Sequence, residues 1–128
     1  MANNTSVQVT GNVVEINFGE EWASPHLKVR TNSKSVQNVQ IKVDDQEFEA
    51  SGSGERNTII FDRTLDTPCK KISATFTYQV ENGDKLESKL NFGGPYDIGR
   101  YKTITVVAEN GDDADYNDAI FEVSGYLK

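Results

Sequence analysis

The chain has 128 residues, 36% of them hydrophobic, and a formal net charge of -7 at pH 7. Its length predicts a single domain, residues 1–128, with a buried core. An acidic chain lacks the basic face that nucleic acids and anionic membranes attract, so the composition argues against both as partners. The only cysteine is Cys69, which excludes an intrachain disulfide.

The N-terminal segment carries no recognisable targeting signal. Residues 1–6 are polar and lack the basic start and apolar stretch of a classical signal peptide. No apolar run approaches the length needed to cross a bilayer. We therefore expect a chain that does not insert into membranes and that is cytoplasmic or exported by a non-classical route.

Apolar and polar residues alternate along most of the chain, which is the period of a half-buried strand. In chain order the alternating or short apolar segments are 7–9, 13–18, 27–29, 39–43, 59–61, 72–78, 90–92, 104–107 and 120–126. The pattern predicts an all-β fold, a single-domain antiparallel β-sandwich of about nine strands.

Turn signals separate these segments. Asp44 and Asp45 predict a two-residue hairpin turn, and residues 81–84, with the sequence Glu-Asn-Gly-Asp, predict another. Residues 51–54 read Ser-Gly-Ser-Gly, and we interpret them as a flexible loop within the domain. The sequence thus predicts strands joined by short connections.

Residues 109–118 hold five carboxylates and two carboxamides, with no Lys or Arg among them. Calcium binds clusters of oxygen ligands in which carboxylates predominate, with six to eight oxygens per ion. The segment is therefore a candidate calcium site. The alternative is a solvated acidic hairpin loop, which is common between two strands.

An EF-hand does not fit this acidic segment. Asp113, Asp115 and Asn117 alternate as in the first half of an EF-hand loop, but the sixth position is Asp118 instead of Gly. The twelfth position is Ser124, which cannot supply a bidentate carboxylate. A metal site of another type remains, and a zinc site is not predicted because His26 is the only histidine.

Residues 109–119 resemble the calcium loop of the bacterial two-calcium lectins that bind fucose and mannose, the LecB-like or PA-IIL-like family. The family loop runs Glu-Asp-Gly-x-Asp-x-Asp-Tyr-Asn-Asp-Ala. The matching residues here are Glu109, Gly111, Asp113, Asp115, Tyr116, Asn117, Asp118 and Ala119. Residues 31–45 and 80–84 are also similar to family segments, so the resemblance covers about residues 26–128 and is weak over residues 1–25.

The resemblance implies two adjacent Ca²⁺ ions per subunit. The implied metal ligands are Asn32, Glu109, Asp113, Asp115, Asn117, Asp118 and the C-terminal carboxylate, here that of Lys128, which would reach the second ion of a neighbouring subunit. The family usually ends in Gly, so the cationic side chain of Lys128 is a departure from the pattern.

The resemblance also implies a sugar site beside the ions. The implied sugar-binding residues are Ser33, Lys34, Ser35 and Asn110, together with Glu109, Asp113, Asp115 and Asp118. Asn110 replaces a family Asp that contacts sugar, so one charge-assisted hydrogen bond becomes a neutral one. Glycans with fucose or mannose are the implied partners, bound by a homodimer or homotetramer.

We therefore expect a calcium-dependent lectin that is not an enzyme. The alternative is a calcium-stabilised β-sandwich with an adhesion or structural role and no sugar site. A glycosidase would need two carboxylates with separated roles, and the acids of the loop are already explained as metal ligands.

Overall fold

The computed structural model of the chain describes residues 5–80, 83–110 and 118–127, and every regular element within them is a β-strand. The strands are β1 (Ser6–Thr10), β2 (Val13–Val43), β3 (Gln46–Thr64), β4 (Cys69–Gln79), β5 (Lys85–Glu87), β6 (Lys89–Ile98), β7 (Tyr101–Glu109) and β8 (Ala119–Leu127). All the pairings between them are antiparallel. The described residues contain no helix that could cross a membrane. The predicted all-β antiparallel fold is confirmed.

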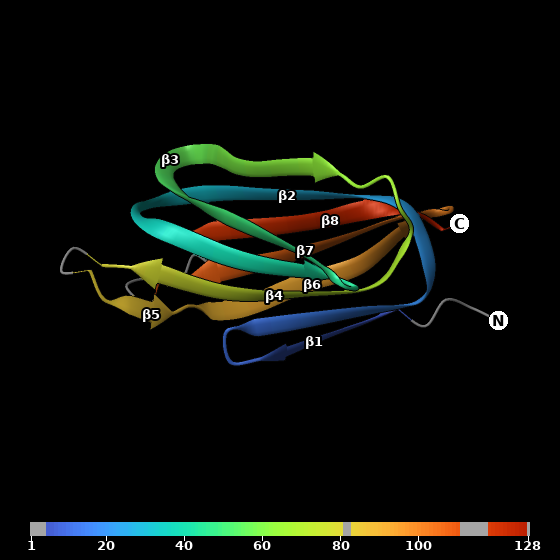
Figure 1. Cartoon of the computed structure of the whole chain (residues 1–128), viewed down its shortest axis with the longest axis horizontal. Helices are drawn as coiled ribbons and strands as arrows, with labels where there is room; N and C mark the ends of the chain where they lie inside the picture. Colours follow the sequence, from blue (N-terminus) through green and yellow to red (C-terminus); the bar gives the residue numbers. More distant parts are fainter. Residues whose placement is uncertain (1–4, 81–82, 111–117, 128) are drawn as a thin grey trace.

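Two long, bent strands connect the two layers of the fold (Figure 1). One layer joins β1, β4 and β5 to both ends of β2, residues 13–17 and 36–43, and to the first part of β3. The other joins the last part of β3 to the middle of β2, and then continues through β8 and β7 to β6. β2 turns between the layers twice, and β3 turns once. The second turn of β2 and the turn of β3 lie side by side at one end of the molecule, on the left in Figure 1.

The core between the layers follows the alternation seen in the sequence. In β7, for example, Ile104, Val106 and Ala108 are fully buried while the residues between them are partly exposed. The same alternation supplies the other core side chains, including Val14, Ile16, Phe18, Leu27, Val29, Val39, Ile41, Ile72, Phe76, Phe121 and Val123. Fully burying one such large apolar side chain contributes about 1.5–3 kcal/mol. This core fixes the register of every strand that reaches the site.

The predicted turn at Asp44 and Asp45 is confirmed, but one predicted loop is wrong, and half of the other predicted turn, residues 81 and 82, lies outside the described residues. Val43 pairs with Gln46 across a two-residue turn in which Asp44 has a positive φ of 51°. Residues 51–54, interpreted from sequence as a flexible loop, belong to β3, where Gly52 pairs with Gln37 and Gly54 with Ser33. A Cβ on Gly52 would come within 2.8 Å of an Ile60 side-chain carbon, so a glycine is needed where β3 folds back on itself.

Candidate calcium and sugar site

Strand register brings residues far apart in the sequence together at the bent end of the sandwich. Thr31 of β2 and Ala108 of β7 both pair with Ala119 of β8. Asp118 continues both pairings, since its carbonyl accepts a hydrogen bond from the Asn32 N–H at 3.1 Å and its N–H donates to the Ala108 carbonyl at 3.1 Å. The structure therefore places Asn32, Glu109 and Asp118, three of the predicted metal ligands, next to one another.

Two carboxylates are buried at this point. Glu109 is 2% exposed and Asp118 is 7% exposed. One oxygen of Asp118, Oδ2, accepts a hydrogen bond from the main-chain N–H of Asn110 at 2.8 Å. Removing a carboxylate from water is costly unless hydrogen bonds or a positive charge offset the loss of hydration. Because the carboxylates of Glu109 and Asp118 are both buried at the same edge of the sheet, binding of a cation there is favoured.

Asn110 links the acidic segment to the rim loop, which we define as residues 33–35. Its Nδ2 donates to the Ser33 hydroxyl at 3.0 Å, and the same hydroxyl accepts from the Ser35 N–H at 3.1 Å. Because Nδ2 is engaged by Ser33, the orientation of the Asn110 carboxamide is set. Its Oδ1 is buried and has no hydrogen-bond partner among the residues that the structure describes. A buried acceptor left in that state would cost about 1–3 kcal/mol, so a partner outside the described residues is expected for it.

The rest of the rim loop faces solvent. Lys34 is exposed and Ser35 is half-buried. Both border a hollow of about 350 Å³ that Val36, Gln79, Val80 and Gly83 close on the side of the turn between β4 and β5. The hollow therefore adjoins the rim loop.

Four of the predicted metal ligands cannot be placed. Asp113, Asp115, Asn117 and Lys128 lie outside the described residues. Within the described part of the chain, no three His, Cys, Asp or Glu side chains form a group that could hold a metal. Of the predicted ligand set, the structure places Asn32, Glu109 and Asp118, and the ligand role of all seven stays a prediction.

One residue at this end of the molecule was not predicted from the sequence. Asn57, in the turn of β3, makes two hydrogen bonds with the side chain of Asn32. No local motif marks it, because its partner lies 25 residues earlier in the chain.

The other reactive side chains do not offer an alternative centre. His26 Nε2 contacts Asp62 Oδ1 at 2.5 Å near the surface. Burial, with a smaller contribution from the negative charge of Asp44, raises the pKa of the Cys69 thiol to about 12. The thiol is therefore neutral at pH 7, and a neutral thiol is a poor nucleophile.

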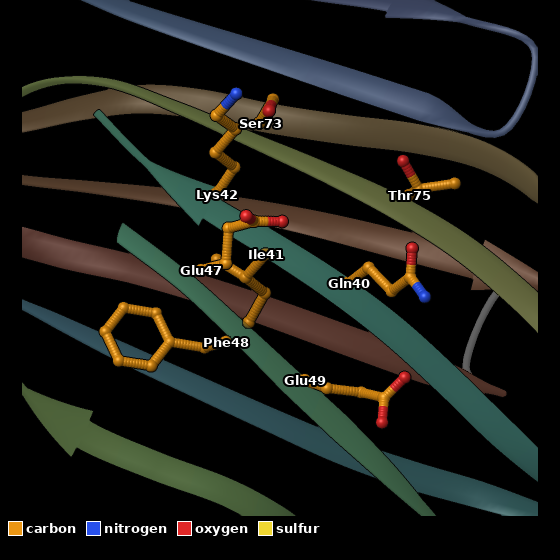
Figure 2. Close-up of a pocket in the computed structure, with 8 residues that line it drawn as sticks. All are labelled: Gln40, Ile41, Lys42, Glu47, Phe48, Glu49, Ser73 and Thr75. Carbon is orange, nitrogen blue, oxygen red and sulfur yellow. The ribbon is translucent and has the colours of Figure 1, made fainter. Parts of the chain in front are cut away.

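A larger hollow lies on the outer side of the sheet, away from the predicted residues. It measures about 410 Å³ and is surrounded by side chains from β2, β3 and β4, with Gln40, Lys42, Glu47 and Glu49 pointing from neighbouring strands in Figure 2. These side chains are exposed, and none of them belongs to the predicted site. The hollow is a groove between surface side chains of one sheet.

Comparison with known proteins agrees with the geometry. The model of the family described as fucose-binding lectin II (PA-IIL) matches residues 16–127. No curated protein matches the chain significantly.

Three solved structures that share the fold are lectins. The Chromobacterium violaceum lectin CV2L, solved in complex with alpha-methyl-fucoside, is 20% identical with a TM-score of 0.70, and the match covers 94% of this chain and 100% of that one. A Ralstonia solanacearum high-affinity mannose-binding lectin is 21% identical with a TM-score of 0.70 and the same coverage. The C-terminal domain of the Burkholderia cenocepacia lectin BC2L-C is 19% identical with a TM-score of 0.67, over 96% of this chain and 100% of that one.

The family match spans nearly the whole chain, and the structural matches share its fold. A lectin binds sugar without converting it, so the prediction that the chain is not an enzyme is confirmed together with the predicted family. The chain belongs to the fucose-binding lectin II (PA-IIL) family.

Proposed function

We propose that this chain is a calcium-dependent lectin that binds fucose- or mannose-type sugars through two adjacent Ca²⁺ ions. The observation that carries the proposal is the convergence of Asn32, Ser33, Glu109, Asn110 and Asp118 from β2 and from the adjoining ends of β7 and β8. Two of these residues are buried carboxylates, and the Asn110 Oδ1 is a buried oxygen without a hydrogen-bond partner among the described residues. CV2L was solved in complex with alpha-methyl-fucoside, and the Ralstonia lectin is described as mannose-binding, which agrees with the proposed sugar class.

The described residues fit calcium. Asn32, Glu109 and Asp118 offer oxygen atoms, which are the ligands that calcium prefers. We propose that Asp113, Asp115 and Asn117 complete the sites, together with the carboxylate of Lys128 from a neighbouring subunit. When bound, calcium would offset the buried negative charge and accept sugar hydroxyl oxygens as ligands.

The chain's own side chains would select the sugar by the directions of its hydroxyl groups. Ser33 holds the Asn110 carboxamide with its Nδ2 turned toward the rim loop, which leaves Oδ1 as the atom that accepts a hydroxyl proton. As a neutral acceptor, Asn110 would bind that hydroxyl less strongly than a carboxylate would. Lys34 and Ser35 would contact whatever extends from the first sugar ring into the neighbouring hollow.

A calcium-stabilised adhesion or structural domain is the competing function. Such a domain would need the carboxylates but not the bridge between Ser33 and Asn110, which leaves a buried acceptor without a partner in the described structure. The bridge therefore favours the lectin.

The chain is expected to bind mannose- or fucose-agarose in the presence of calcium and to elute with EDTA, because the sugar hydroxyls would need the metal as a partner. Elution by free mannose or fucose in the presence of calcium, but not by galactose, would distinguish binding at the sugar site from adhesion to the resin. Passage through both resins at millimolar calcium would support the structural role instead.

We also propose that two copies associate through the outer face of the layer formed by β6, β7 and β8. Ile98 is 74% exposed and Tyr126 is 59% exposed, and both flank Tyr101 in the strand register. The rings of Tyr101 and Tyr126 meet edge to face with centroids 5.1 Å apart. Exposed apolar side chains gathered on one face are typical of a contact surface, and joining sites raises the avidity of a weak lectin.

We expect the wild-type chain to be a dimer or larger in light scattering, and Tyr126→Asp to shift it toward the monomer by placing a charge in the interface. Leu86→Asp, at an exposed apolar site on β5, is the matched control and should leave the assembly unchanged. A wild-type monomer at high micromolar concentration would contradict the proposal.

A further inference from the structure

The turn of β3 next to the site has a costly backbone. Arg56 and Asn57 have positive φ values of 64° and 57° in succession, and Gly54 has a φ of 146°. A Cβ on Gly54 would lie 2.5 Å from the Thr58 hydroxyl, which itself donates to the Glu55 carbonyl at 2.7 Å. Non-glycine residues in the left-handed region each cost about 1 kcal/mol or more, and Asn tolerates it better than most. The surrounding contacts hold the turn in this shape.

The shape of the turn directs Asn57 at Asn32. The Asn57 main-chain N–H donates to Asn32 Oδ1 at 2.7 Å, and Asn32 Nδ2 donates to Asn57 Oδ1 at 2.9 Å. A main-chain N–H can only donate, so the oxygen of the Asn32 carboxamide must face it, and the orientation of the carboxamide is fixed. These two bonds join β3 to β2 where the strand register shifts between Thr31 and Ser33.

Asn32 is thus fixed on both sides. Its main-chain N–H is bound to the Asp118 carbonyl, and its side chain is bound to Asn57. Any ligand oxygen that Asn32 offers to a cation, whether Oδ1 or its main-chain carbonyl, depends on both attachments. Partners of this kind orient metal ligands, and losing one weakens metal binding.

We infer that Asn57 is a positioning residue, which fixes Asn32 for the second calcium ion of the proposed lectin site. The inference rests on the proposed function. It assigns to the turn at residues 54–58 a contribution to metal binding that is made through Asn32.

Asn57→Gly tests the inference with little backbone cost, because glycine adopts the left-handed conformation and keeps the main-chain N–H. Of the two hydrogen bonds with Asn32, it removes only the one that Asn57 Oδ1 accepts from Asn32 Nδ2. We expect the calcium Kd in titration calorimetry to rise about 3- to 10-fold, the effect of losing one hydrogen bond. Asn57→Asp keeps the acceptor and should bind calcium within twofold of wild type or more tightly.

Arg56→Gly is the matched control, because it makes the same backbone change at the preceding left-handed residue without removing a contact to Asn32. It should leave the calcium Kd within twofold or lower it, since a positive charge is lost. In an Asn32→Ala background, Asn57→Gly should cause no further loss, because it acts through Asn32. An equal loss in both backgrounds would overturn the positioning role.

A calcium-free measurement supports or overturns the inference independently of metal binding. Proton exchange at the Asn32 side-chain NH₂ of the calcium-free protein, followed by NMR, should be faster in Asn57→Gly than in wild type or Arg56→Gly. Unchanged exchange would overturn the inference alone. A wild-type chain that binds no calcium would overturn the inference and the proposed function together, whereas wild-type binding matched by Asn57→Gly would overturn only the inference.

Discussion

Asp118→Asn should lower sugar affinity at 1 mM calcium by about 100-fold or more, which corresponds to about 2.7 kcal/mol. Asp118 is buried and lies where β2, β7 and β8 meet, and we propose that its carboxylate bridges both ions. Asn is nearly the same shape, and its amide oxygen can still accept the hydrogen bond from the Asn110 N–H. The substitution therefore removes one negative charge while keeping the local fold, and calcium affinity depends strongly on the charge of its ligands.

The measurement is calorimetry with methyl fucoside and methyl mannoside for the wild type, Asp118→Asn and the control Asp45→Asn. Asp45 is an exposed acid in the turn between β2 and β3, and its loss changes the net charge equally without touching the site. Asp45→Asn should bind as the wild type does. Sugar affinity of Asp118→Asn within threefold of the wild type would show that this carboxylate does not hold calcium.

Much of the fold could be predicted because the core residues obey a period of two. Val14, Ile16 and Phe18 are buried in turn in β2, and Ile104 and Val106 in β7. A sandwich needs one apolar face on each strand, so this pattern identifies both the strands and the faces that pack.

The bends of β2 and β3 could not be predicted from local sequence. Residues 51–54 have the composition of a loop, yet Gly52 and Gly54 pair with β2, whose register shifts on both sides of Ser33. Glycine is favoured in loops, in bulges and at close contacts alike. Only the long-range pairing decides between these uses, and that pairing is set by residues elsewhere in the two strands.

The residues of the site also include some that the sequence predicts and one that it does not. Asn32, Glu109, Asn110 and Asp118 were predicted because the segments that hold them resemble a family pattern, and the strand register brings these residues together. Asn57 could not be identified, since its role depends on a left-handed turn and on a partner in another strand. A residue that supports a ligand from a different strand leaves no spacing signature in the sequence.

Removing calcium with EDTA should lower the melting temperature by about 10 °C relative to the protein in 1 mM calcium. A ligand that binds only the folded state adds about 2.7 kcal/mol at 100 times its Kd and about 4.1 kcal/mol at 1,000 times. For a chain of this length, each kcal/mol shifts the melting temperature by about 3–5 °C. Calcium would stabilise the fold by offsetting the charge of residues 109–118. This segment holds five carboxylates, including the buried Glu109 and Asp118, and no Lys or Arg.

Asp118→Asn separates calcium binding from other effects of EDTA. With one carboxylate fewer, the calcium-free variant should melt at or above the temperature of the calcium-free wild type, because the remaining carboxylates repel one another less. Its melting temperature should respond much less to added calcium.

Magnesium in place of calcium should restore little of the wild-type stability, since it demands octahedral geometry and gives up its water reluctantly. Identical melting curves of the wild type in EDTA and in calcium would mean that the acidic segment is a solvated hairpin, and the buried Glu109 and Asp118 would then have to be offset by hydrogen bonds alone.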